Sequence, residues 1–75
     1  MNNTRRKQLR KLAEQIAIET DEINDLISEE EEYKDNMPEN LQETDRYYDS
    51  ETAVDAMTEV ANLLSEATDK LQEIE

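Results

Sequence analysis

The second half of the chain carries apolar residues at steps that alternate between four and three. From residue 53 onward the series is Ala53, Met57, Val60, Leu64, Ala67, Leu71 and Ile74. This spacing places the residues on one face of an α-helix and is typical of the contact seam of a coiled coil or bundle. Val54, Ala61 and Leu63 widen that stripe, which favours a helical bundle over a bare two-stranded coiled coil.

The first half carries a less regular helical pattern. Leu9, Ile16 and Ile23 repeat every seven residues, and Thr20 interrupts the stripe. Thr4 is a good N-cap residue, so a helix is predicted over about residues 5–35. The adjacent positions are filled by Leu12, Ala13, Leu26 and Ile27.

A single proline divides the two patterns. Pro38 cannot continue a helix, and the residue before a proline avoids helical backbone angles. The turn is therefore predicted at residues 36–43 and the second helix at about 44–74, with Thr44 as its cap. Met37 and Leu41 are expected to fold back over the end of the apolar core.

These elements predict an all-α fold, a single domain over residues 1–75 in which two long helices form an antiparallel hairpin. Each helix would be about 45 Å long, and a short connection makes the two helices neighbours. A chain of 75 residues buries only a small core, and the absence of cysteine excludes disulfide reinforcement. We therefore expect a homo-oligomer, with a four-helix-bundle dimer favoured.

Charge is distributed unevenly along the chain. The sequence has 21 acidic and 8 basic residues, a net charge of −13. Five of the bases form an N-terminal basic cluster, Arg5, Arg6, Lys7, Arg10 and Lys11. An antiparallel hairpin would bring this cluster beside acids of the second helix, and we expect pairing that sets the register. The acids concerned are Glu66, Asp69, Glu73 and Glu75.

Composition argues against several classes of site. Histidine, cysteine and glycine are all absent, so neither a zinc ligand set nor a glycine-bearing calcium loop is expected. We expect no catalytic site and no cofactor. No aromatic residue interleaves with the basic cluster, so direct nucleic-acid binding is not expected. Without an apolar run near the ~20 residues of a membrane span, or a signal-type h-region, we expect a cytoplasmic protein that does not enter membranes.

The turn end is the candidate contact surface. Tyr47 and Tyr48, with Tyr33 near them, either cap the core or form a contact patch of the kind tyrosine favours in interfaces. A basic partner is expected, because an antiparallel hairpin brings Asp49, Glu51 and Asp55 to the same end as the glutamates and makes that end strongly negative. The candidate contact residues are Met37, Pro38, Asn40, Leu41, Tyr47 and Tyr48, rimmed by Glu29, Glu30, Glu31 and Glu32.

The residues Asn36-Met37-Pro38-Glu39-Asn40-Leu41-Gln42, followed by Arg46-Tyr47, resemble a group of small acidic helical proteins of bacteriophages and prophages. In that group a helix beginning in basic residues typically leads to such a turn and then to a helix rich in alanine, acids and aliphatic residues. The resemblance covers most of the chain. It implies a phage origin and the cytoplasm of a bacterial host, and it assigns no catalytic residue.

The leading hypothesis is a non-enzymatic phage or prophage interaction protein that binds and modulates a host or phage protein. The alternative is an acidic DNA mimic, whose rows of carboxylates occupy the DNA-binding groove of a host or defence protein. A structural or assembly component of a virion is a second alternative.

Overall fold

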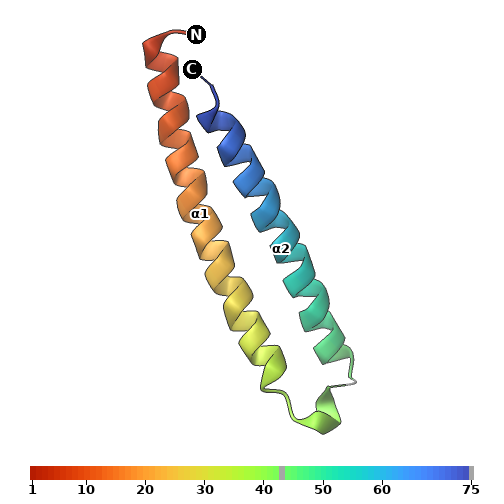
Figure 1. The fold of residues 1–75 in the computed structure, drawn as a ribbon. Helices are drawn as coiled ribbons and strands as arrows, with labels where there is room; N and C mark the ends of the chain where they lie inside the picture. Colours follow the sequence, from red (N-terminus) through yellow and green to blue (C-terminus); the bar gives the residue numbers. More distant parts are fainter. Residues whose placement is uncertain (43, 75) are drawn as a thin grey trace.

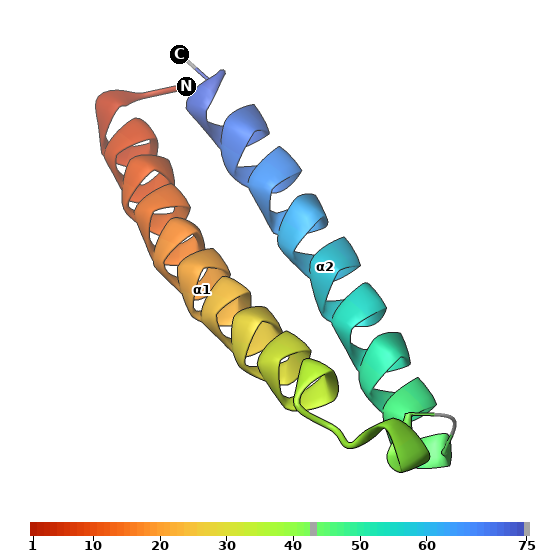
Figure 2. The ribbon, with the colours of Figure 1, turned by 60° about the horizontal axis from the view of Figure 1, so that its bottom comes forward.

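The chain folds as two long helices joined by a short connection (Figure 1). The computed structural model describes residues 1–42 and 44–74. Helix α1 spans Asn3–Asp35, the 3-10 helix η1 spans Glu39–Leu41, and α2 spans Asp45–Gln72. Figures 1 and 2 show α1 and α2 side by side and antiparallel, with both termini at one end. The predicted all-α hairpin is confirmed, as a rod of 60 × 14 × 12 Å between Cα atoms.

The start of α1 is two residues earlier than predicted because a different residue caps it. The side chain of Asn2 accepts a hydrogen bond from the Arg5 backbone N–H at 2.8 Å. Asn2 therefore satisfies one of the free N–H groups of the first turn. Thr4, the predicted cap, lies within the helix.

The connection follows from Pro38, as predicted. The last turn of α1 closes when the Asn36 N–H donates to the Glu32 carbonyl at 3.0 Å. Pro38 then adopts extended angles, with φ −57° and ψ 149°, and the chain leaves the helix axis. The predicted turn at 36–43 matches the observed connection, although residue 43 lies outside the described residues.

Thr44 occupies the N-cap position of α2, as predicted, but its side chain has another role. Its hydroxyl donates to the Leu41 carbonyl at 2.6 Å instead of accepting from the first turn of α2. Thr44 therefore fastens the end of the connection to the start of the helix.

Helix α1 meets α2 along a regular seam. Every buried or half-buried residue of α1 belongs to one series with alternating steps of three and four. Members of that series come to one side of a helix. The series is Arg6, Leu9, Ala13, Ile16, Thr20, Ile23, Ile27, Glu30 and Lys34, and Met37 continues it beyond the helix.

The seam of α2 is not the one that the apolar spacing predicted. Val54, Ala61 and Thr68 replace the expected Ala53, Val60 and Ala67, while Val60 and Ala67 are exposed. The observed seam is Tyr47, Ser50, Val54, Met57, Ala61, Leu64, Thr68 and Leu71.

This register buries polar residues whose hydroxyl groups find partners. The Thr68 hydroxyl donates to the Leu64 carbonyl at 2.9 Å, and the Thr20 hydroxyl donates to the Ile16 carbonyl at 2.7 Å. Satisfied hydroxyls cost little to bury. The threonines on these faces therefore pack in the core, although the sequence pattern treated Thr20 as an interruption of the apolar stripe.

The core of the hairpin is thin. Its buried apolar residues are Ala13, Met37, Val54 and Ala61, and no large side chain of the described residues is fully buried. Several large apolar side chains stay exposed, among them Leu12, Leu26, Val60 and Leu63. Neither described helix is long and apolar enough to cross a bilayer.

Candidate interaction surface at the turn end

The turn end consists of the last turn of α1, the connection through η1 and the first two turns of α2. Met37 and Leu41 differ in how they are placed there. Met37 is 8% exposed and covers the end of the seam, as predicted, so it does not present a contact surface. Leu41 was expected to cover the core beside Met37, but it is 37% exposed on η1. Leu41 therefore faces solvent at the tip of the rod.

The sequence left open whether the two adjacent tyrosines cap the core or form a contact patch, and the structure gives one tyrosine each position. Tyr47 is half-buried in the seam, and the Lys34 ammonium lies 5.8 Å from its ring centroid. This is a cation–π contact between the end of α1 and the start of α2. Tyr48 is 52% exposed and packs edge-on against Tyr47, with ring centroids 5.9 Å apart. Tyr47 thus belongs to the core, and it supports an outward-facing Tyr48.

The four consecutive glutamates near the end of α1 differ in how far they are exposed. Glu30 is half-buried, and one of its carboxylate oxygens accepts a hydrogen bond from the buried Ser50 hydroxyl at 2.7 Å. Glu29, Glu31 and Glu32 are exposed. The rim predicted from four glutamates therefore has three members that can face a partner.

The connection holds its shape through backbone and side-chain hydrogen bonds. The Leu41 N–H donates to the Pro38 carbonyl at 2.8 Å, and the Gln42 side-chain amide donates to the Met37 carbonyl at 3.3 Å. Pro38 and Asn40 are exposed on this framework. The predicted contact residues that remain exposed at the turn end are Leu41 and Tyr48, Pro38 and Asn40 of the connection, and Glu29, Glu31 and Glu32 on α1.

The opposite end does not show the predicted charge pairing. The two termini do lie together, but none of the side-chain hydrogen bonds of the described residues joins a basic side chain to a carboxylate. Arg6 donates to the Asn3 side chain at 3.2 Å and lies with Arg10 near Leu71 and Gln72. Glu75 lies outside the described residues.

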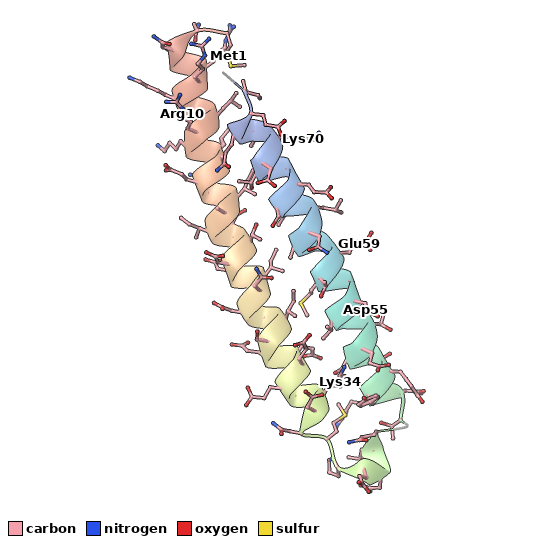
Figure 3. All side chains as sticks on the ribbon, viewed as in Figure 1. Met1, Arg10, Lys34, Asp55, Glu59 and Lys70 are labelled. Carbon is pink, nitrogen blue, oxygen red and sulfur yellow. The ribbon has the colours of Figure 1, made fainter. Side chains whose placement is uncertain are left out.

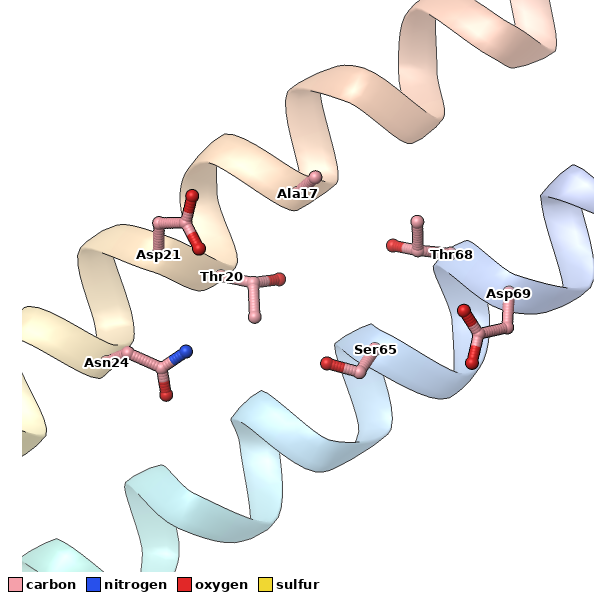
Figure 4. Close-up of a pocket in the computed structure, with 7 residues that line it drawn as sticks. All are labelled: Ala17, Thr20, Asp21, Asn24, Ser65, Thr68 and Asp69. Carbon is pink, nitrogen blue, oxygen red and sulfur yellow. The ribbon is translucent and has the colours of Figure 1, made fainter.

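A shallow polar groove crosses the middle of the rod (Figure 4). It has a volume of about 210 Å³, and the Thr20 and Thr68 hydroxyls beside it are bonded to backbone carbonyls of their own helices. No cluster of acidic residues suited to a metal ion occurs among residues 1–42 and 44–74. The lining residues are Ala17, Thr20, Asp21, Asn24, Ser65, Thr68 and Asp69.

Sequence reasoning missed Ser50 as a partner of Glu30. Its position, seven residues before Met57 on the observed seam, was the available signal. Comparisons of this chain with protein-family models, with curated proteins and with solved structures found no match. The geometry of the chain itself therefore carries the functional argument.

Proposed function

We propose that this chain is a non-catalytic interaction protein that binds a basic surface of another protein through its turn end. The observation that carries the proposal is Tyr48, a half-exposed aromatic side chain held on a supporting ring at the same end of the rod as the exposed Leu41. An aromatic anchor inside a polar, charged rim is the usual arrangement of an interface hot spot.

The charges at this end support a basic partner. Glu29, Glu31 and Glu32 are exposed on α1, and Asp45 and Asp49 are exposed on α2. Two cations lie at this end, Lys34, which is half-buried against Tyr47, and the exposed Arg46, and they are fewer than the acids. The net field at the turn end is therefore negative, which speeds encounter with a positive surface and suppresses binding to acidic ones.

Self-association is part of the proposal. The thin core leaves half-exposed leucine, isoleucine and valine side chains on a chain too small to form a large core alone. A second hairpin that covers them would complete a four-helix bundle. The proposed setting, a phage or prophage protein acting in a bacterial host, rests on the resemblance of the turn residues.

Affinity capture with a tagged chain from bacterial lysate tests the binding surface. Tyr48→Ala should weaken retention of the partner by roughly 30-fold, the effect of losing about 2 kcal/mol at a hot spot. Leu41→Ala should weaken it in the same direction. Leu12→Ala, which removes a similarly exposed leucine near the other end, is the matched control and should bind as the unmodified chain does. Equal retention by all four chains would contradict the proposal.

A DNA mimic is the second candidate, and the distribution of acids along the rod favours it. Asp55 and Glu59 lie on the side of α2 away from α1 (Figure 3), and acids recur along the 60 Å rod. A mimic should release its partner steeply as salt rises and should compete with duplex DNA for it. Binding centred on Tyr48 should show modest salt dependence and no competition by DNA.

A further inference from the structure

Helix α2 and the residues just after it carry a second apolar series, of which the hairpin covers only Ala53 in part. It also advances by alternating steps of three and four, and no acidic residue occurs within it. Val60 is 45% exposed, Leu63 is 56% exposed and Ile74 is 41% exposed. We call this series the outer stripe: Ala53, Ala56, Val60, Leu63, Ala67 and Ile74, with Lys70 between the last two.

The angle between the outer stripe and the seam around α2 matches the angle between the two neighbours of a helix in a four-helix bundle. At about 100° of rotation per residue, the centre of the outer stripe lies roughly 110° around α2 from the centre of the seam. A helix in a four-helix bundle contacts two neighbours at about this angle. Helix α1 occupies one of these directions, and the other is open.

We infer that the outer stripe of α2 binds the outer stripe of a second copy, with the two α2 helices antiparallel. The inference rests on the dimer proposed above and adds its contact face and its orientation. Antiparallel packing about the midpoint between Leu63 and Leu64 is self-complementary, because each large residue of the stripe apart from Leu63 then faces a small one. Val60 then meets Ala67 of the second copy, and Ala53 meets Ile74 of the second copy.

Charge favours the antiparallel orientation over the parallel one. Parallel copies would place the two acidic turn ends together. Antiparallel copies bring the basic cluster of one chain toward the acidic half of the other, which is attractive. Four cations of that cluster, Arg5, Lys7, Arg10 and Lys11, are exposed and make no side-chain hydrogen bond to a carboxylate of the described residues, so they can face a second copy.

The shared face of the two α2 helices is short. Leu63 lies nine residues, about 14 Å, from the end of α2 and eighteen residues, about 27 Å, from its start. Antiparallel copies centred there share α2 over twice the shorter distance, about 27 Å, and leave each turn end projecting. With the 14 Å width of the rod, this face offers on the order of 400 Å² per copy, about half of the ~800 Å² of a standard interface. The dimer is therefore expected to form through a small interface that the charge attraction supplements.

Sedimentation equilibrium with circular dichroism tests the contact face. The unmodified chain should be a dimer, and Leu63→Glu should be a monomer that keeps its helical signal. Ile18→Glu changes an equally exposed side chain on α1 that lies outside the outer stripe, so it should remain a dimer. A monomeric unmodified chain, or a dimer that Ile18→Glu breaks and Leu63→Glu leaves intact, would overturn the inference.

Cysteine cross-linking tests the orientation, since the chain has no cysteine of its own. A mixture of Val60→Cys and Ala67→Cys chains should form the mixed disulfide under mild oxidation. Val60→Cys alone should not, because its two copies lie about 10 Å apart along the axis, beyond disulfide reach. Efficient cross-linking of Val60→Cys alone would show parallel packing and overturn the inference. Failure of the dimer leaves partner capture by Tyr48 testable on the monomer.

Discussion

Ser50 makes the one hydrogen bond between α1 and α2 side chains in the described part of the chain. Ser50 is 4% exposed, and its hydroxyl donates to the half-buried Glu30 carboxylate at 2.7 Å. Removing one partner of such a pair leaves the other without compensation, whereas replacing both by apolar groups does not. The contact therefore fixes how the helices meet at the turn end more than it adds net stability.

Ser50→Ala should lower the free energy of unfolding by about 1 kcal/mol, because the half-buried Glu30 carboxylate loses its hydrogen-bond donor. The double variant Glu30→Leu with Ser50→Ala should recover that loss or exceed the unmodified stability. Urea unfolding followed by circular dichroism measures both. Ser65→Ala, at an exposed position of the same helix, is the control and should change stability by less than about 0.5 kcal/mol.

Additive losses in the double variant would contradict this account of Ser50. They would mean that the Glu30 carboxylate contributes through contacts other than the hydrogen bond with Ser50.

Substitutions at Asn2 and Thr4 test which of the two residues caps the first turn of α1. Asn2→Ala should cost about 0.5–2 kcal/mol of helix stability, because the Arg5 N–H loses its acceptor. Amide hydrogen exchange at Arg5 should become faster as the first turn opens. Thr4→Ala should leave exchange at Arg5 unchanged, and the opposite ranking would show that Thr4 is the cap.

The two helices themselves were largely predictable from the sequence. The period of the apolar residues, Pro38 and the Thr44 cap position gave two helices and their connection to within about two residues at each end. The register of α2 was not predictable, because two series with helical spacing both contain Met57, Leu64 and Leu71. They differ only in the residues between these three, which are Val60 and Ala67 in one series and Ala61 and Thr68 in the other. The choice depends on α1, whose seam accepts Thr68 once that hydroxyl bonds to its own helix.

Two alanines of α1 test the seam without touching the outer stripe. Ala13 is 4% exposed in the seam, and Ala17 is exposed one helical turn later. Ala13→Asp should destroy most of the helical signal, since it buries an unpaired carboxylate in a thin core, at a cost of several kcal/mol. Ala17→Asp should cost under about 1 kcal/mol. Circular dichroism measures the helical signal of both variants. A similar loss of signal in the two variants would show that the seam does not pass through Ala13.

The candidate site was predictable in location but not in detail. Proline, the tyrosine pair and the run of glutamates marked the turn end. The sequence predicted that Met37 covers the core, but it wrongly placed Leu41 there too and left the roles of Tyr47 and Tyr48 open. Leu41 lies on η1, to which the period of neither long helix extends. Nor could the sequence show that the basic cluster makes no side-chain hydrogen bond to a carboxylate among residues 1–42 and 44–74, since proximity of two helix ends does not require pairing between exposed charges.

The whole rod combines two surfaces that do not overlap. The outer stripe lies along α2, and the turn end projects beyond it. In an antiparallel dimer the two turn ends lie at opposite tips, so one dimer offers two separate binding sites.

The stoichiometry of the complex recovered by a tagged chain, measured by native mass spectrometry, tests this account most directly. We expect the unmodified complex to contain two chains and two partner molecules. Leu63→Glu should reduce it to one chain with one partner, and Tyr48→Ala should remove the partner but leave the dimer. A complex that Tyr48→Ala leaves intact and Leu63→Glu abolishes would contradict the account, because the partner would then bind where the second copy is proposed to lie.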